Sequence, residues 1–334
     1  MIKIYAILLY ILLNMSEKYI TTKENLKNTI EQYGVAIIEN VLNEDEIKDM
    51  NTGMWDYLEH ITQKFDKPIN RNNKESWSEY TKLYPKHSML LQNWGIGHSQ
   101  FIWDIRQNNN VIDIFANLWK CENEDLLVSF DGASFHLPPE ITNRGWYRGN
   151  MWYHTDQSYT RNNFECIQSW VTGYDVNEND ATLAFLEYSN KYHKEFSEQY
   201  DIKDKSDWYK HTKDELKFYL DEKDCTEKRI TCKAGSMVFW DSRTIHCGTE
   251  PIKTREGDNI RNAVYICMMP RQLSTNALIR KKQKAFTELR TTNHWANKPK
   301  LFPKNPRTYG GPIPDVVEID KPQLNKMGYK LAGF

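Results

Sequence analysis

The part of the chain after residue 125 consists of short runs of β-branched and aromatic residues separated by turn-forming residues. The runs are shorter than a typical helix, and the Asp-Gly, Ala-Gly and Asp-Ser pairs between them are typical of tight turns. The runs that we expect to form strands are 126–130, 151–154, 166–174, 182–187, 229–232, 237–240, 244–246 and 261–269. Many short strands joined by turns favour an antiparallel sandwich or jelly roll.

The part before residue 125 has a mainly helical pattern. Residues 19–33 are polar with helical spacing, whereas residues 35–38 are apolar and predict a short buried strand. Asn43 is followed three residues later by Glu46, the pattern of a capping box, which predicts that a helix begins there. Apolar positions between 99 and 119 predict further helical turns.

These patterns predict a mainly β domain with flanking helices (α+β). We expect one domain over residues 15–334, with a helical part at 15–124, a jelly-roll core at 125–271 and a C-terminal wrap at 272–334. The tail from Pro299 contains six of the twelve prolines, which favours an extended path over the surface.

Composition excludes some classes of protein. The chain has 334 residues, 44 Lys and Arg against 45 Asp and Glu, and a net charge of −1, whereas a general nucleic-acid binder would carry a basic stripe. An aromatic content of 13% argues against disorder. The six cysteines form no CxxC pair, which favours reduced thiols and a cytoplasmic location.

The amino terminus carries a short apolar segment. Residues 4–13 are strongly apolar, but a transmembrane helix needs about 20 such residues, so we expect no stable membrane span. We favour Met15 as the true start, which would make residues 1–14 a misassigned leader. A signal or anchor and a structural helix are the alternatives, although no A-x-A-like cleavage site follows.

A histidine and an aspartate stand two residues apart in an aromatic stretch of the β-rich part. On a strand, the side chains of His154 and Asp156 would point to the same face. With one distant histidine, such a pair forms the 2-His-1-carboxylate facial triad of non-haem Fe(II) oxygenases, which leaves coordination positions open. The alternative is a His and an Asp that only bond to each other near the surface.

Residues 233–246 supply a distant histidine. A Gly-led turn is followed by a hydrophobic strand, a tight Asp-Ser bend and a second short strand that ends at His246. His246 is therefore the candidate third ligand, and an ordinary loop histidine is the alternative. A second His-x-acidic pattern, His193 with Glu195, lies in a charged run that we expect to be an exposed helix or loop, where such residues do not share a face.

The strand expected at 261–269 begins with an arginine. Its odd-numbered residues, from Arg261 to Cys267, would share one face. A guanidinium there can hold a carboxylate through two parallel hydrogen bonds, which a lysine cannot match. Arg255, in a polar loop, and Arg271, beyond the far end, are weaker candidates. A surface position for Arg261 is the alternative.

Six segments carry a resemblance to a known family. They are YGVAIIENVLNEDEI (33–47), LLVSFDGASFHLPPE (126–140), WYHTDQSY (152–159), CIQSWVTGYDV (166–176), KAGSMVFWDSRTIHCGTEP (233–251) and RNAVYICMMPR (261–271). In the order and spacing of these segments the chain resembles the phytanoyl-CoA dioxygenase family of Fe(II)/2-oxoglutarate-dependent oxygenases, and residues 280–295 continue the match.

The resemblance implies a double-stranded β-helix (jelly roll, cupin-like) core, a mononuclear Fe(II) and 2-oxoglutarate as co-substrate, with O2 and a small-molecule substrate as the other reactants. Ascorbate is a further candidate cofactor. By position, the resemblance implies that His154, Asp156 and His246 bind iron and that Arg261 binds the far carboxylate of 2-oxoglutarate. It also implies that Trp170 and Gln168 line the co-substrate pocket. It assigns no catalytic residue beyond the metal centre.

The chain departs from the family pattern at two places. Many members have Gly-Ser-His where this chain has residues 187–191, and Ser or Thr where it has Gly248, which leaves open which hydroxyl assists the arginine. Asp156 is not the Gly or Ala that would make room for a halide, so the resemblance implies hydroxylation and not halogenation.

Two other functions compete with an oxygenase. A jelly roll can also serve as a non-catalytic binding or structural protein, because fold does not fix function. The presence of all three candidate ligands argues against this alternative. A zinc hydrolase would need an activating Glu close to the metal, and none stands near His154 in the sequence.

Overall fold

The computed structural model describes residues 16–334. The apolar leader predicted at 1–14 and the start predicted at Met15 lie outside the described residues. Within 16–334, no helix combines the length and the apolar character that crossing a bilayer requires.

The strands form two main antiparallel sheets and one extra pair. The larger sheet has the order β1 (Val35–Ile38), β10 (Met237–Asp241), β6 (Ile167–Thr172), β12 (Arg261–Ile266), β4 (Ala133–His136) and β2 (Leu90–Leu91). The smaller has the order β8 (Tyr209–Lys210), β5 (His154–Thr155), β11 (His246–Thr249), β7 (Thr182–Leu186) and β9 (Glu227–Arg229). The extra pair is β13 (Met268–Pro270) with β3 (Leu126–Val128).

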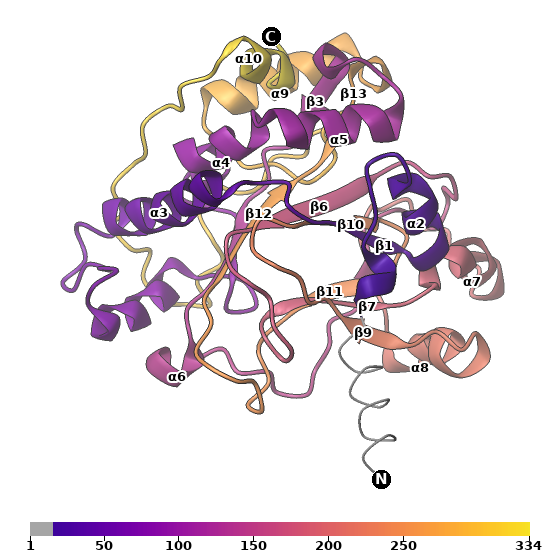
Figure 1. Ribbon diagram of the computed structural model, residues 1–334, viewed down its shortest axis with the longest axis horizontal. Coiled ribbons are helices and arrows are strands. Elements are labelled where there is room, and N and C mark those ends of the chain that lie inside the picture. Colours follow the sequence, from indigo (N-terminus) through magenta and orange to yellow (C-terminus); the bar gives the residue numbers. More distant parts are fainter. Residues whose placement is uncertain (1–15) are drawn as a thin grey trace.

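Helices cover the outer face of the larger sheet, and the smaller sheet faces its inner side (Figure 1). The α-helices are α2 (Leu26–Tyr33), α3 (Glu44–Ile61), α4 (Gln100–Arg106), α5 (Asn109–Trp119), α6 (Pro139–Thr142), α7 (His193–Gln199), α8 (Lys213–Lys217), α9 (Asn276–Thr287) and α10 (Lys326–Leu331). Short 3-10 turns lie at Glu17–Tyr19, Lys74–Leu83, Ile96–His98, Asn123–Asp125, Ser189–Tyr192 and Arg271–Leu273, and a π turn at Phe218–Glu222.

The alternation of side chains along β10 separates two hydrophobic layers. Met237 and Phe239 belong to the core that the helices cover. Val238 and Trp240 point the other way and pack with residues of the smaller sheet such as Phe185. Each sheet therefore buries one face against the other, which is how a jelly roll encloses a site between its sheets. The predicted fold class is confirmed.

Most local predictions agree with the structure. The capping box of Asn43 and Glu46 is present at the start of α3, and the helical turns expected at 99–119 form α4 and α5. The tail after residue 299 is largely extended and ends in α10, so it agrees with the predicted wrap apart from that helix.

Three predictions about strands were wrong. The strand expected at 261–269 breaks at Cys267, which packs in a separate hydrophobic cluster and does not share a face with Arg261. His246 begins β11 and does not end a strand. The strand expected at 151–154 forms only from His154, in β5. β2, β4 and β8 were not predicted, because their short segments lack a clear alternation. The extent of a single domain over 15–334 stays a prediction.

Candidate metal centre

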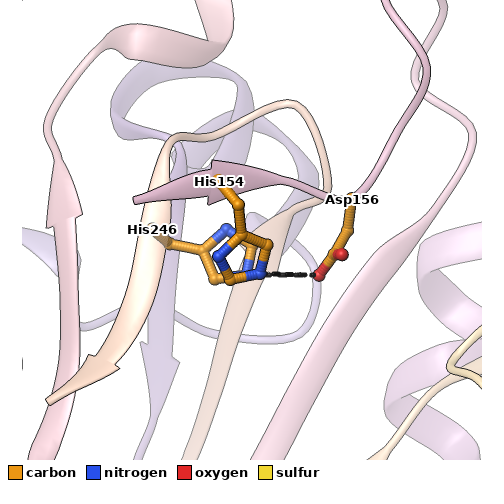
Figure 2. Close-up of side chains that lie close together, drawn as sticks. All are labelled: His154, Asp156 and His246. Carbon is orange, nitrogen blue, oxygen red and sulfur yellow. Dashed lines mark ion pairs between the residues drawn. The ribbon is translucent and has the colours of Figure 1, made fainter. Parts of the chain in front are cut away.

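His154 and His246 are brought together by the pairing of β5 with β11. The two histidines are direct partners in this antiparallel register, so their side chains lie on the same face. Asp156 follows the last residue of β5, and its amide donates to the carbonyl of Ser242 at 2.9 Å. Nε2 of each imidazole lies 3.4 Å from Oδ2 of Asp156. Figure 2 shows the three side chains turned towards one another. All three side chains are buried, and one ligand atom from each lies within 4.8 Å of the others.

The orientation of both imidazoles is fixed by their other ring nitrogen. Nδ1 of His154 lies 3.3 Å from the carbonyl oxygen of Trp152, and Nδ1 of His246 lies 2.8 Å from that of Thr244. Because a carbonyl only accepts, Nδ1 carries the proton in each ring and Nε2 presents its lone pair towards Asp156. This is the arrangement in which histidines bind a metal through Nε2.

The charge states also suit a cation. Burial would raise the pKa of Asp156, but the neighbouring His154 and His294 hold that pKa well below its usual range. Burial, with His154 beside it, lowers the pKa of His246. An ionised carboxylate and a neutral imidazole are the forms that bind a divalent metal. The donor set and its charge state therefore fit an iron ion.

Gln168 lies against the carboxylate. It is on β6, and its Nε2 donates to Oδ2 of Asp156 at 3.0 Å and lies 3.2 Å from Oγ of Ser242. Gln168 was predicted to line the co-substrate pocket, and in the structure it contacts the candidate metal ligand Asp156. Two residues further along the same face of β6, Trp170 lies beneath Arg261. The inner face of β6 therefore extends from Asp156 to Arg261.

Trp240 and His294 also belong to this site but were not singled out from the sequence. The indole N–H of Trp240 donates to Nε2 of His246 at 3.1 Å, so a metal bound to His246 would displace this hydrogen bond. Nε2 of His294 is buried and has no hydrogen-bond partner within residues 16–334. The strand 237–240 could have indicated Trp240, whereas His294 lies in a segment without regular structure.

Arg261 is buried at the start of β12, so the surface alternative was wrong. Its Nε donates to Oγ of Ser134 at 3.0 Å, and its Nη1 donates to the carbonyl of Ala181 at 3.2 Å. Its guanidinium carbon lies 4.8 Å from the ring centre of Trp170. Nη2 of Arg261 makes no hydrogen bond to any described residue, and Nε1 of Trp170 is buried without a partner in that part of the chain. Two donors are therefore available to an acidic ligand.

The hydroxyl that orients Arg261 comes from Ser134. Thr249 does not serve, because its Oγ1 accepts a hydrogen bond from Arg229 at 3.1 Å. The other arginine of this region, Arg255, is also buried, but it forms ion pairs with Glu140 at 2.6 Å and with Asp180 at 3.1 Å. Arg255 is therefore a structural cation.

The second His-x-acidic pattern forms no metal site. His193 is buried, contrary to the prediction of an exposed segment, and its ring nitrogens lie 3.0 Å from Oδ1 of Asn162 and 3.2 Å from the carbonyl oxygen of Gln157. Glu195 points away on α7 and forms an ion pair with Lys223. In residues 16–334, the group of His154, Asp156 and His246 is the single cluster of this kind with metal-binding spacing.

Comparisons with known proteins identify relatives of this chain by sequence and by fold. Ava biosynthesis cluster protein O of Aspergillus versicolor is 30% identical over 210 residues, which are 60% of this chain and 64% of that protein, so the match spans less than two thirds of its length. A hypothetical protein of Escherichia coli has a TM-score of 0.57 at 13% identity, with coverage of 95% of this chain and 85% of that one. The GlcNAc-inducible gene 2 protein of Candida albicans has a TM-score of 0.50 at 13% identity, covering 83% and 69%.

These two structures share the fold with this protein. The family itself is shown by sequence, because the profile described as Phytanoyl-CoA dioxygenase (PhyH) matches residues 30–257, more than half of the chain. The chain therefore belongs to the phytanoyl-CoA dioxygenase family of Fe(II)- and 2-oxoglutarate-dependent enzymes.

Proposed function

We propose that the protein is a dioxygenase that couples the oxidative decarboxylation of 2-oxoglutarate to the hydroxylation of a small molecule. The observation that carries this proposal is the meeting of two imidazole Nε2 atoms and one carboxylate oxygen in a buried site. His154, Asp156 and His246 would hold Fe(II), and the iron would supply the activation of O2. The carboxylate of Asp156 occupies the position that a halide would need, which favours hydroxylation.

Arg261 is the proposed anchor for 2-oxoglutarate. Ser134 and Ala181 hold two of its nitrogens, so Nη2 is presented in a fixed direction. Nε1 of Trp170, which has no hydrogen-bond partner in residues 16–334, is a second donor, and its ring packs against the Arg261 guanidinium. The distal carboxylate of 2-oxoglutarate at this point would accept hydrogen bonds from both donors. Without such a ligand, a buried donor that lacks a partner destabilises the folded state. Gln168 would position Asp156 for the metal. Ascorbate would serve as an external reductant.

We further propose a cytoplasmic location. All six cysteines are free, and Cys166 and Cys267 remain unbonded although their sulfur atoms lie only 3.8 Å apart. Free thiols in such proximity are typical of proteins from a reducing compartment.

The test is turnover of the purified full-length chain. With Fe(II), O2 and 2-oxoglutarate labelled at its C1 carboxylate, we expect release of labelled CO2, and we expect His154→Ala to abolish it. His60→Ala is the matched control, because His60 lies on α3, where its ring Nε2 lies 2.9 Å from the carbonyl oxygen of Glu318. If the wild-type protein binds no iron and releases no CO2, the proposal is wrong and the non-catalytic alternative is favoured.

A further inference from the structure

A cavity of about 700 Å³ lies at the end of β4, where His136 and Leu137 line it. Its walls come from the 77–93 segment, from the end of α6 and from residues 302–309 of the C-terminal wrap. Cavities of this size hold ligands as large as typical drug molecules. None of the three candidate metal ligands and neither Arg261 nor Trp170 lines it, so it is distinct from the proposed co-substrate site.

Aromatic rings form much of the lining. Trp77, Tyr80, Tyr84, Phe302 and Tyr309 all border the cavity. Tyr309 is 85% exposed, although rings of this kind are usually covered by protein. Flat aromatic walls with an exposed ring at the edge favour a ligand with an apolar or aromatic body.

The charge of the lining has one sign. Lys86, Arg144 and Arg307 border the cavity, and no Asp or Glu does. Within residues 16–334, none of these three cations forms an ion pair. The whole chain nevertheless has nearly equal numbers of basic and acidic residues, 44 and 45. Burial, and then the charge of Arg307, lowers the pKa of Lys86. Like charges held close together without a counter-ion destabilise one another, and an anionic ligand would relieve this repulsion.

Two contacts connect this cavity with the proposed active site. His87 lines the cavity and stacks on Trp152 at 3.8 Å between ring centres, and Trp152 stacks in turn on His154 at 4.7 Å. On the other side, His136 lines the cavity and is the strand partner of Arg261. The cavity is therefore separated from Arg261 by one side chain, that of His136, and from His154 by two, those of His87 and Trp152.

We propose that this cavity binds the primary substrate and that the substrate is an organic anion, with an apolar or aromatic body and a carboxylate or phosphate group. The identification of the ligand as the substrate rests on the proposed function. The anion site itself is formed by residues outside the metal centre. The rings would pack against the body, and Lys86, Arg144 and Arg307 would bind the charged group.

The test is a calorimetric titration of the full-length chain with benzoate, phenyl phosphate and neutral benzamide at one fixed, low ionic strength. We expect both anions to bind at least about tenfold more tightly than benzamide, since hydrogen bonds to charged groups are worth that much or more. The tighter of the two anions identifies the charged group. Equal affinity for benzamide and the anions would overturn the proposal.

The variants make the test specific. Arg144→Gln combined with Arg307→Gln should weaken the anions by at least about tenfold and leave benzamide unchanged. Lys304→Gln is the matched control, because this exposed residue lies in the same segment as Arg307 but does not line the cavity. Unchanged anion affinity in the double variant, or an equal loss in Lys304→Gln, would contradict the site.

Failure of the two proposals can be told apart. His154→Ala should still bind benzoate or phenyl phosphate, because its side chain is outside the cavity lining. Anion binding without any CO2 release in the wild-type protein would overturn the proposed function. CO2 release without selective anion binding would overturn this inference alone.

Discussion

Gln168 donates its hydrogen bond to Oδ2 of Asp156, the same oxygen atom that lies 3.4 Å from Nε2 of both His154 and His246. A single carboxylate oxygen therefore faces two imidazoles and one amide. Because an amide donor fixes the direction of the carboxylate without competing for a metal, Gln168 is a positioning residue for the centre.

The Gln168→Ala variant should bind metal more weakly. Loss of such a supporting hydrogen bond typically reduces metal affinity by about 10- to 100-fold. Titration with Fe(II) or Co(II), followed by absorbance or calorimetry, measures the change. Gln283→Ala is the control, because Gln283 also donates to a protein oxygen, the carbonyl of Gly333, but lies far along the chain on α9. Equal affinities in the two variants would argue against a role for Gln168.

The Arg261→Lys variant should have a higher KM for 2-oxoglutarate. A lysine cannot keep the bonds to Ser134 and Ala181 and also bind a carboxylate, so we expect KM to rise by about tenfold or more. Metal affinity should not change, because Arg261 contacts none of the candidate ligands. Arg255→Lys should instead lower the melting temperature with KM preserved, because Arg255 pairs with Glu140 and Asp180. A reversal of these two outcomes would assign the anchor to Arg255.

The protein should lose stability as the pH falls below 6.5. His98 donates from Nε2 to the carbonyl of Arg290 and accepts at Nδ1 from Trp103, so the folded state holds it neutral. Burial, with the charge of Arg106 next, lowers the pKa of His98 to about 3. The unfolded chain takes up this proton near pH 6.5, so stability is present above that pH and is lost as the pH falls towards 3.

The size of this effect can be measured on one residue. Towards pH 5, where the unfolded imidazole is almost fully protonated, His98→Gln should remove about 1.4 kcal/mol per pH unit from the slope of the unfolding free energy, the equivalent of one proton. Denaturant unfolding at several pH values gives this slope. His60→Gln, at a partly exposed position on α3, should leave the slope unchanged. A His98→Gln slope equal to that of the wild type would show that His98 is not held neutral.

The Gly34→Ala variant should be destabilised. Gly34 ends α2 with φ of 85°, and a Cβ there would lie 2.7 Å from Oγ1 of Thr244. The strained backbone and the close contact together should cost about 1–3 kcal/mol of unfolding free energy. Metal affinity should fall as well, because the carbonyl of Thr244 orients His246.

Gly310→Ala separates the two causes. Gly310 has φ of 88° but no atom within 4 Å of the added Cβ, so it carries the backbone strain without the contact. Its loss of stability should be smaller than that of Gly34→Ala. An equal loss would mean that the contact with Thr244 contributes nothing.

Much of the candidate site could be predicted from local sequence. The i, i+2 spacing of His154 and Asp156 and the position of Arg261 at the start of a strand are short-range features, and the structure brings them to the inner side of the two sheets. The burial of His193 could not be predicted from the charged residues around it, most of which are exposed. Its ring is buried because it packs on Tyr159, which lies in a distant segment.

The sequence by itself determined which side chains can bind a metal, where most strands of the core lie, and the family to which the chain belongs. Only the tertiary structure decided that Ser134 orients Arg261, that Trp240 and Gln168 bond to the candidate ligands, and that Lys86, Arg144 and Arg307 line one cavity. These relationships join segments far apart in the chain, and strand register and the path of the C-terminal wrap bring them together. Local periodicity carries information on neither.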